Sequence, residues 1–509
     1  MEYKAIHADW EITMGCNMRC RHCGSSCHKP LSGQLTTSEA LRLCDDIGKL
    51  GLKSITLTGG EPLTRPDWHY IADRLQENGV TTDIMTNGWL LTEQLLDQAN
   101  AVGVDGFIIS LDGDREVHDI MRRQGSYGRV INALEIIEQK GIRAEVITTV
   151  HRINFHNLSK IRKTLSEYNV KTWRINLALP MGNFAKHSDK ILETPQFNEV
   201  VDFINESISD DQITILPGDC FGYYSHKDSA VRKKSNGTRQ SQAWQGCDAG
   251  KRGFGILHNG DIIGCYYIRD KRFVEGNVRE VPLSDIWNSK TSFAWNRVAV
   301  NGKLAGLCGV CKYGDTCFGG CANLRLTMNG NVLSENRYCS YNQALFQAWQ
   351  KVESITDVEI LASMGKDFVK QGELQLAHML LQKALTFHPD DIELLNYFSY
   401  TCYLLHHYTA AQEASERALV MDPDNVYANE GMGVIFAKQG DLKKGVNHLC
   451  KAAKHTTNNY MTPYYDLIVI LAESGRLQSA LKVIQQAEIK APGFKRKYLR
   501  GNIANLHAK

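Results

Sequence analysis

Ten of the fifteen cysteines in this 509-residue chain stand in two spaced groups, and the first group is the strongest chemical signal. It reads Cys16-Asn-Met-Arg-Cys20-Arg-His-Cys23 and directly follows a β-rich run. Three thiolates this close in one loop can hold three irons of a [4Fe-4S] cube and leave the fourth iron without a protein ligand. Chemistry takes place at such an open metal site, although a short cysteine triplet can also form part of a zinc site.

A second motif, Thr58-Gly59-Gly60-Glu61-Pro62, follows the next β-rich run. Its glycines let the backbone approach a ligand closely, and Glu61 can accept a hydrogen bond from an ammonium group. By itself the motif is also compatible with a plain tight turn. Later runs end in further polar residues, and each of these is ordinary turn chemistry when taken alone: Asn87, Ser110, Asp112 and Asn154.

The second cysteine group lies between residues 247 and 339. Its members are Cys247, Cys265, Cys308, Cys311, Cys317, Cys321 and Cys339. Because CxxC is also a unit of zinc ribbons, a pair of zinc knuckles is the competing interpretation. The remaining five cysteines are scattered, and we interpret them as small buried hydrophobic residues: Cys27, Cys44, Cys220, Cys402 and Cys450.

The elements that must position the first group form an alternating β/α series over residues 5 to about 180. We expect strands at residues 6–13, 54–58, 82–86, 106–111, 144–150 and 173–179, and helices at 38–50, 68–77, 92–101, 127–140 and 158–168. Such a series requires a parallel sheet, whose ligands lie at the carboxyl ends of the strands. The motif residues follow the strands, as this arrangement demands.

The rest of the chain is organised differently. Residues 226–242 are polar and basic, which is typical of a loop or linker, and we assign them no chemistry. Residues 241–345 combine seven cysteines with many glycines and few long periodic segments, so metal clusters would have to stabilise them.

A period of about 34 residues marks the C-terminal part. Alignment brings into register Ala384, Ala418, Ala452 and Ala487, then Leu374, Tyr408, Leu442 and Leu477, and the turn glycines Gly372, Gly440 and Gly475. This pattern resembles the tetratricopeptide repeat over residues 358–495 and predicts an all-α solenoid of helix pairs. Its concave face would bind a peptide or protein segment, or serve as a packing or dimerisation platform.

The CxxxCxxC triplet together with Gly59-Gly60-Glu61-Pro62 resembles the signature of the radical S-adenosylmethionine (SAM) superfamily. The resemblance implies a partial (β/α)6 TIM-like barrel over residues 1–215, with S-adenosyl-L-methionine bound to the open iron of the Cys16, Cys20 and Cys23 cluster. It further implies that His22 lies beside the adenine, that Gly59, Gly60, Glu61 and Pro62 bind the methionyl amine, and that Asn87, Ser110, Asp112 and Asn154 face the cofactor or substrate. The stretch His118-Asp119 with Arg122 belongs to the same set of matches.

The second cysteine group is similar to the SPASM domain, which implies two auxiliary [4Fe-4S] clusters within residues 241–345 and three clusters in all. By this resemblance Cys308, Cys311, Cys317 and Cys339 hold one cluster, and Cys247, Cys265 and Cys321 hold the other. Some relatives have a fourth ligand where this chain has Gly253, so that cluster either has an open iron or recruits a ligand such as Cys220. Tyr266 stands where sulfatase-maturating relatives have a catalytic aspartate, and it is a candidate proton donor.

The resemblance implies reductive cleavage of SAM and hydrogen abstraction by a 5'-deoxyadenosyl radical. We expect oxidative crosslinking (C–C, C–O or thioether) in a ribosomally made precursor peptide. The alternatives are maturation of a residue in a folded protein, as in sulfatase or quinone-enzyme maturation, and peptide epimerisation. A cluster-bearing repeat scaffold without catalysis is the alternative from another class. The repeats of residues 350–509 would hold the peptide leader, with 216–240 as a linker, and flavodoxin or ferredoxin would be the reductant.

Charge and hydropathy exclude other classes of partner. The formal net charge is +2 and no apolar run approaches the length of a membrane span, so neither nucleic acid nor a membrane is an expected partner. The first residues lack the basic and apolar regions of a signal peptide, and we expect a cytoplasmic protein.

Overall fold

The computed structural model describes residues 3–168, 170–207, 212–218, 220–222, 227–235, 244, 246–297, 304–309, 311 and 313–499. The chain divides into two compact units. The first comprises Met1–Gly309 and Tyr313–Gln343, and the second comprises Val310–Lys312 and Ala344–Lys509.

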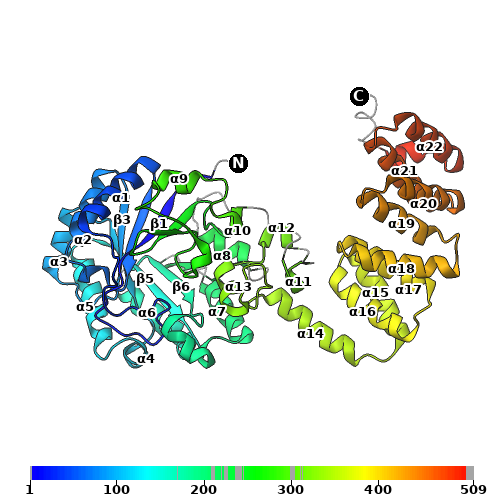
Figure 1. Ribbon diagram of the computed structural model, residues 1–509. Coiled ribbons are helices and arrows are strands. Elements are labelled where there is room, and N and C mark those ends of the chain that lie inside the picture. The colour runs from blue at the N-terminus through cyan, green and yellow to red at the C-terminus, as the bar shows by residue number, and fades with distance from the viewer. Residues whose placement is uncertain are drawn as a thin grey trace. The chain divides into compact units, whose positions relative to one another are not determined.

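A ten-stranded sheet of order β10-β9-β8-β1-β2-β3-β4-β5-β6-β7 forms the centre of the first unit (Figure 1). The first seven strands are parallel to their neighbours, so the expected six-strand β/α series is confirmed and continues by one strand. The strands are β1 (His7–Thr13), β2 (Ser54–Gly59), β3 (Thr81–Thr86), β4 (Gly106–Ser110), β5 (Arg143–Val150), β6 (Thr172–Leu177), β7 (Thr214–Pro217), β8 (Gly253–Ile256), β9 (Asp261–Ile263) and β10 (Val274–Asn277).

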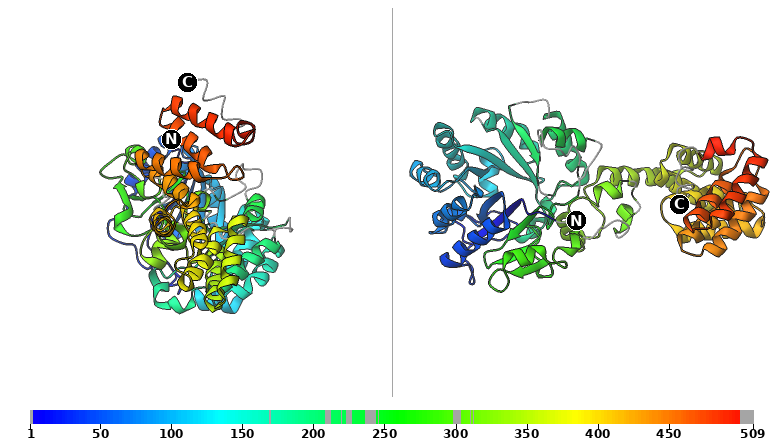
Figure 2. Two further views of the ribbon diagram at one scale, coloured as in Figure 1. Left: turned by 90° about the vertical axis from the view of Figure 1, so that its right-hand side faces the viewer. Right: turned by 90° about the horizontal axis from the view of Figure 1, so that it is seen from above.

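Helices connect the parallel strands and lie along the outside of the curved sheet (Figure 2). They are α1 (Thr37–Leu50), α2 (Trp68–Glu77), α3 (Glu93–Ala101), α4 (Arg115–Met121), α5 (Ser126–Gln139), α6 (Leu158–Glu167) and α7 (Thr194–Glu206). The first of them shows why these segments are helical. Thr36 and Glu39 form a capping box at its start, and Gly51 ends it in the left-handed region at φ 76°.

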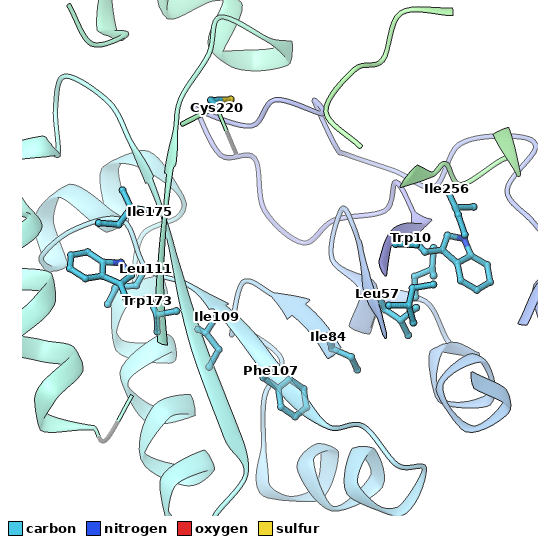
Figure 3. Close-up of a cluster of buried hydrophobic side chains, with 14 of the residues drawn as sticks. Trp10, Leu57, Ile84, Phe107, Ile109, Leu111, Trp173, Ile175, Cys220 and Ile256 are labelled. Atoms are coloured by element: carbon cyan, nitrogen blue, oxygen red, sulfur yellow. The ribbon is translucent and has the colours of Figure 1, made fainter. Parts of the chain in front are cut away.

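The core lies between the sheet and these helices. On β1, Trp10 and Ile12 are fully buried in it, and Trp10 lies beside its β8 neighbour Ile256 (Figure 3). Because side chains alternate along a strand, Glu11 and Thr13 point to the opposite face, and they are buried too. The inner face of the barrel therefore contains buried polar side chains.

The cysteine-rich region joins the same sheet. β8 pairs in parallel with β1, and β9 and β10 follow it in antiparallel pairing. The first strand of this region thus completes the hydrogen bonding of β1, and stabilisation of the region by metal clusters stays a prediction. The helices of this region are α9 (Leu283–Asn288), α10 (Ala294–Arg297), α11 (Gly306–Gly309), α12 (Gly314–Cys317) and α13 (Ala322–Asn329). Helix α14 (Ser340–Ser354) begins in the first unit and belongs to the second from Ala344 on.

Part of the stretch interpreted as a loop or linker, residues 226–242, is helical, so that interpretation is wrong there. Helix α8 spans Asp228–Ser235. Asp228 is fully buried and pairs with Arg232 at 2.8 Å, one helical turn later, which explains how a polar sequence forms a stable helix here. Residues 226 and 236–242 lie outside the described residues.

The second unit is all-helical, as expected. Its helices are α15 (Val358–Gln371), α16 (Leu374–Phe387), α17 (Ile392–Leu404), α18 (Tyr408–Met421), α19 (Val426–Lys438), α20 (Leu442–His455), α21 (Thr462–Glu473), α22 (Leu477–Lys490) and α23 (Phe494–Tyr498). Consecutive helices α15 to α22 contact one another in sequence order, which is consistent with a solenoid of helix pairs. The specific assignment to tetratricopeptide repeats stays a prediction.

The aligned positions take equivalent places in this unit. Leu374, Tyr408, Leu442 and Leu477 each begin the second helix of a pair, and the four aligned alanines are fully buried. The turn glycines have positive φ angles, between 76° and 89°. Cys402 is buried as expected, but Cys450 is exposed, so the interpretation as a buried residue is wrong for Cys450.

Candidate active site

The cysteine triplet lies in a loop after β1 that backbone hydrogen bonds hold in place. Cys16 N donates to His28 O at 3.0 Å, and His28 N donates to Met14 O at 3.1 Å. Asn183 secures the other end, since its backbone N–H donates to Cys23 O at 2.9 Å and its side chain donates to Cys20 O at 3.1 Å. The three thiols are thereby fixed in one loop.

The thiols lie in partly buried surroundings. Burial raises the pKa of Cys20 to about 12. Cys23 differs, because a hydrogen bond from the neighbouring Cys27 thiol lowers the pKa of Cys23 to about 5. Cys27 also lies 3.5 Å from Gly59 O, so a residue we had interpreted as a simple core side chain contacts both predicted motifs.

The two glycines of the second motif pack against the loop that carries Cys16. Gly60 N donates to Thr13 O at 2.7 Å, and Glu61 N donates to Gly15 O at 2.8 Å. A Cβ atom at Gly59 would lie 2.1 Å from Thr13 O, and one at Gly60 would lie 2.1 Å from Gly15 O. The glycines are therefore required for a close contact within the protein, in addition to any approach to a ligand.

Glu61 has no exposed surface and accepts only neutral donors among the hydrogen bonds described for it. Thr86 Oγ1 donates at 2.8 Å, Asn87 N at 2.8 Å and Leu63 N at 3.3 Å. Burial raises the pKa of Glu61 to about 7, although the hydrogen bonds from Asn87 and Thr86 oppose the rise. A buried carboxyl group in this setting fits a cationic ligand such as an ammonium group.

Asp112, at the carboxyl end of β4, is the centre of a buried polar network. Its Oδ2 lies 3.1 Å from His22 Nε2 and accepts from Arg122 Nε at 2.5 Å, while Oδ1 accepts from Thr149 N at 2.9 Å. Burial acts to raise the pKa of Asp112, but Arg122 and His22 hold it well below its usual range. This network ties His22 of the cysteine loop to two strand ends.

Other predicted cofactor residues lie near these groups. Asn87 donates to Asn17 Oδ1 of the cysteine loop at 2.7 Å, and Asn154 donates to Asp112 O at 2.8 Å. Pro62 begins a short 3-10 helix that Glu61 caps, and Ser110 is the last residue of β4. The structure thus brings the predicted strand-end residues together at one edge of the sheet.

Tyr266 lies inside the same unit, where Thr58 hydrogen-bonds to it and Arg269 lies 5.4 Å from its ring centroid. Burial raises the pKa of Tyr266, so its phenol stays protonated. Arg269 Nη2 donates to the buried Glu11 at 2.5 Å. The sequence analysis missed this pair, although an acidic residue within the apolar run of β1 was a detectable signal.

The second cysteine group surrounds a buried arginine. Arg325 of α13 interacts electrostatically with Cys321, Cys308, Cys247 and Cys317. Burial lowers the pKa of Arg325, and within the described part of the chain its Nε and Nη1 have no hydrogen-bond partner. Such donors are costly unless an acceptor meets them, so this setting fits the anionic sulfurs of an iron-sulfur cluster.

Individual cysteines of this group share other contacts. Asn342 donates to Cys308 Sγ at 3.6 Å through its side chain and to Cys339 Sγ at 3.5 Å through its backbone, which places these two thiols together.

Gly253 stands where some relatives have a fourth ligand to the cluster expected on Cys247, Cys265 and Cys321. Gly253 begins β8, where a Cβ atom would lie 2.2 Å from Nε2 of the exposed His7 side chain, so a larger residue there would require His7 to move. Cys220 is buried, and Asn323, two residues after Cys321, approaches its Sγ at 4.0 Å. Cys220 therefore stays a candidate for this role.

A pocket of about 500 Å³ lies beside the cysteine loop. The loop, the segment after Tyr266, and α13 provide its walls. Its lining residues are Gly24, Ser25, Ser26, Met181, Gly182, Tyr267, Ile268, Arg269, Asp270, Arg272, Asn323, Leu326, Thr327 and Gly330. Gly24 directly follows Cys23 and Asn323 lies two residues after Cys321, so the pocket borders the cysteine loop and the helix that follows Cys321.

Comparison with known proteins decides the family. Residues 10–166 match the Radical SAM superfamily, and residues 247–312 match SPASM, an iron-sulfur cluster-binding domain. The chain is 30% identical over 342 residues to the AdoMet-dependent heme synthase of Nitratidesulfovibrio vulgaris, covering 65% of this chain and 91% of that protein. This chain belongs to the radical SAM superfamily. It is an enzyme with a SPASM domain, and its cofactors are S-adenosylmethionine and iron-sulfur clusters of the [4Fe-4S] type.

Two further proteins are similar to this chain. The mycofactocin maturase MftC of Mycobacterium tuberculosis is 28% identical over 319 residues, covering 61% of this chain and 77% of that protein. The crystal structure of Streptococcus suis SuiB bound to precursor peptide SuiA has a TM-score of 0.54 at 16% identity, covering 66% of this chain and 76% of that chain. The latter likeness supports the fold. In the described part of the chain no helix is long and apolar enough to cross a membrane.

Replacing Gly60 by alanine tests the contact that joins the two motifs. We expect Gly60→Ala to lower stability by about 1–3 kcal/mol and to reduce the iron retained per chain, because the new methyl group collides with the Gly15 carbonyl. Anaerobic thermal unfolding and metal analysis measure both effects. The control is Gly128→Ala, in α5, where a Cβ atom meets nothing nearer than 3.6 Å. Equal behaviour of the two variants would contradict the packing argument.

Proposed function

We propose that this enzyme oxidises a side chain of a ribosomally made precursor peptide and forms an intramolecular crosslink. Cys16, Cys20 and Cys23 would hold the cluster that binds S-adenosylmethionine. When bound, the cluster and S-adenosylmethionine would supply reductive cleavage to a 5'-deoxyadenosyl radical, which would take a hydrogen atom from the substrate. The observation that supports the proposal is the pocket bordered by Gly24, next to Cys23, and by Asn323, two residues after Cys321, because a peptide bound there would lie close to the loops that carry the cysteines.

The chain's own residues have defined tasks in this proposal. Glu61 would receive the methionyl ammonium group, since it is buried and accepts hydrogen bonds from neutral donors. His22, held by Asp112, would lie against the adenine, and the packed glycines would keep the cysteine loop in register with Glu61. Tyr266, with its pKa raised by burial, would act as a proton donor beside the pocket.

We propose two auxiliary clusters, one held by Cys308, Cys311, Cys317 and Cys339 and the other by Cys247, Cys265 and Cys321. Formation of a crosslink removes two electrons and two protons from the peptide. One electron and one proton would leave together as the hydrogen atom taken up in 5'-deoxyadenosine, and an auxiliary cluster would accept the second electron while the second proton is lost. A flavodoxin or ferredoxin would return reducing equivalents to the catalytic cluster.

A second candidate substrate is a tetrapyrrole, because this chain matches 95% and 91% of the length of two AdoMet-dependent heme synthases. The charges at the pocket favour the peptide. Arg269 pairs with the buried Glu11, and Arg272 pairs with Asp270 at 2.5 Å, so both lining arginines are already compensated. A substrate that carries several carboxylates would need cationic partners beyond these.

Turnover of the reconstituted holoenzyme tests the proposal. We expect about twelve irons per chain for three clusters, and release of 5'-deoxyadenosine that rises when a candidate precursor peptide is added. Cys20→Ala should lose release and about four irons, whereas Cys450→Ala, an exposed cysteine outside both groups, should keep both. Mass spectrometry should show a peptide lighter by two hydrogens. Conversion of iron coproporphyrin with no effect of the peptide would favour the tetrapyrrole.

We also propose that the helical repeats hold the peptide leader. The second unit has its own hydrophobic clusters, so a chain ending at residue 349 leaves the buried core of the first unit intact. We expect this truncation to weaken peptide binding by at least tenfold, measured by fluorescence anisotropy, while peptide-independent cleavage of S-adenosylmethionine continues. Unchanged affinity would contradict this role of the repeats.

Arg325 provides a spectroscopic test of the auxiliary clusters. Removing its positive charge should stabilise the oxidised clusters, so Arg325→Gln should lower their reduction potential by on the order of 50 mV. Redox titration followed by electron paramagnetic resonance measures the change. Arg325→Lys should restore most of the potential, and Arg279→Gln, at an exposed ion pair with Glu39, should leave it unchanged. Equal potentials in all variants would exclude a cluster beside Arg325.

A further inference from the structure

Three side chains of types that can ligate a metal lie close together in the second unit, and none of them belongs to the two cysteine groups. They are His378 of α16, Cys402 of α17 and His407, the residue that precedes α18. One ligand atom from each lies within 4.8 Å of the other two. The histidine rings contact edge to face with centroids 5.5 Å apart, and Cys402 is fully buried. Within the described residues no side-chain hydrogen bond occupies any of the three.

The other repeats have different residues at these three positions. The repeat period aligns Cys402 with Phe368, Phe436 and Leu471, so a small thiol here replaces a large apolar side chain. His378 aligns with Gln412, Val446 and Leu481, and His407 aligns with Glu373, Asp441 and Arg476. A cysteine and two histidines therefore replace unrelated residues at the same junction, which the packing of the repeats does not require.

The turn beside this group differs from its counterparts as well. Gly372, Gly440 and Gly475 occupy the left-handed turn position in the other repeats, and His406 occupies it here at φ 61°. The left-handed conformation is unfavourable for a residue with a side chain. This second repeat accordingly departs from the pattern at the turn and at all three neighbouring positions.

We propose that His378, Cys402 and His407 form a Zn²⁺ site that links α16 to α17 and to the start of α18. Two imidazoles and one thiolate are the ligand types that Zn²⁺ selects, and ligands at about 2.0–2.3 Å in tetrahedral geometry lie roughly 3.3–3.7 Å apart. Side-chain rotation closes the remaining gap. Binding displaces the thiol proton of Cys402 to the solvent, and the fourth position is left for water.

Zn²⁺ is bound by neutral imidazole rings, and burial keeps both histidine rings of this group neutral. Burial lowers the pKa of His378 to about 4, so its ring is neutral and offers a lone pair at neutral pH. Burial also lowers the pKa of His407. The groups that face them are Phe398, which lies 5.0 Å from the His378 ring, and the exposed His406. Burial also raises the pKa of the Cys402 thiol to about 12, so the metal itself would have to displace this proton.

Metal analysis of the full-length holoenzyme tests the site. The protein, with its iron-sulfur clusters reconstituted, is equilibrated with ZnCl₂ and desalted, and zinc and iron per chain are then measured. We expect one zinc in the wild type and at least a tenfold loss in Cys402→Ala, with iron unchanged. Zinc K-edge X-ray absorption should report one sulfur and two nitrogen neighbours. Cys450→Ala, the exposed cysteine of the same unit, should keep its zinc.

A second variant guards against simple misfolding. His407 precedes α18 as its N-cap, a position that asparagine occupies well, so His407→Asn should preserve the helix and still lose the zinc. Chelation should lower the unfolding temperature of the wild type and leave that of His407→Asn unchanged. The proposal is overturned if His407→Asn retains zinc, or if the X-ray absorption spectrum shows only sulfur neighbours of the zinc. It is also overturned if the wild type binds no more zinc than Cys402→Ala.

Discussion

The backbone contact between the Gly59-Gly60 pair and the loop after β1 is the constraint on which the catalytic edge depends. Two N–H groups of the second motif donate to Thr13 O and Gly15 O, and the space between the two backbones admits no side chain. As a result the residues that carry the Cys16 thiol and the Glu61 carboxyl group are held by the same rigid backbone contact. Two motifs separated by more than thirty residues in sequence are therefore positioned as one.

Buried charge pairs extend this rigidity across the inside of the barrel. Glu11 of β1 binds His258 and Arg269, both of which follow β8, and Asp112 of β4 binds His22 and Arg122. Breaking such a pair leaves an uncompensated buried charge, which typically costs 3–5 kcal/mol. The same low-dielectric surroundings strengthen each interaction with a bound ligand. The cysteine loop is thus fixed at its end by His22 and at its start by the strand that carries Glu11.

Much of this arrangement was predictable from local patterns. The β/α periodicity predicted the parallel strands, and the strand-end positions of Asn87, Asp112 and Asn154 predicted that they would meet. The pairing of β8 with β1 was not predictable, because the four-residue segment Gly253–Ile256 is too short for a periodic signal and its partner is distant in sequence. The placement of Arg325 among cysteines was equally hidden, since a single arginine in a helix is ordinarily a surface residue.

The pairing of β8 with β1 also has a consequence for biosynthesis. About 240 residues separate the end of β1 from the start of β8, so one edge of β1 is without its neighbour while that stretch is being translated. At about 5–20 residues per second the delay is roughly 10–50 s. An unpaired strand edge is prone to associate with other chains. The nascent protein thus has a defined interval in which a chaperone on the ribosome would protect it, and that interval closes only when the cysteine-rich segment has emerged.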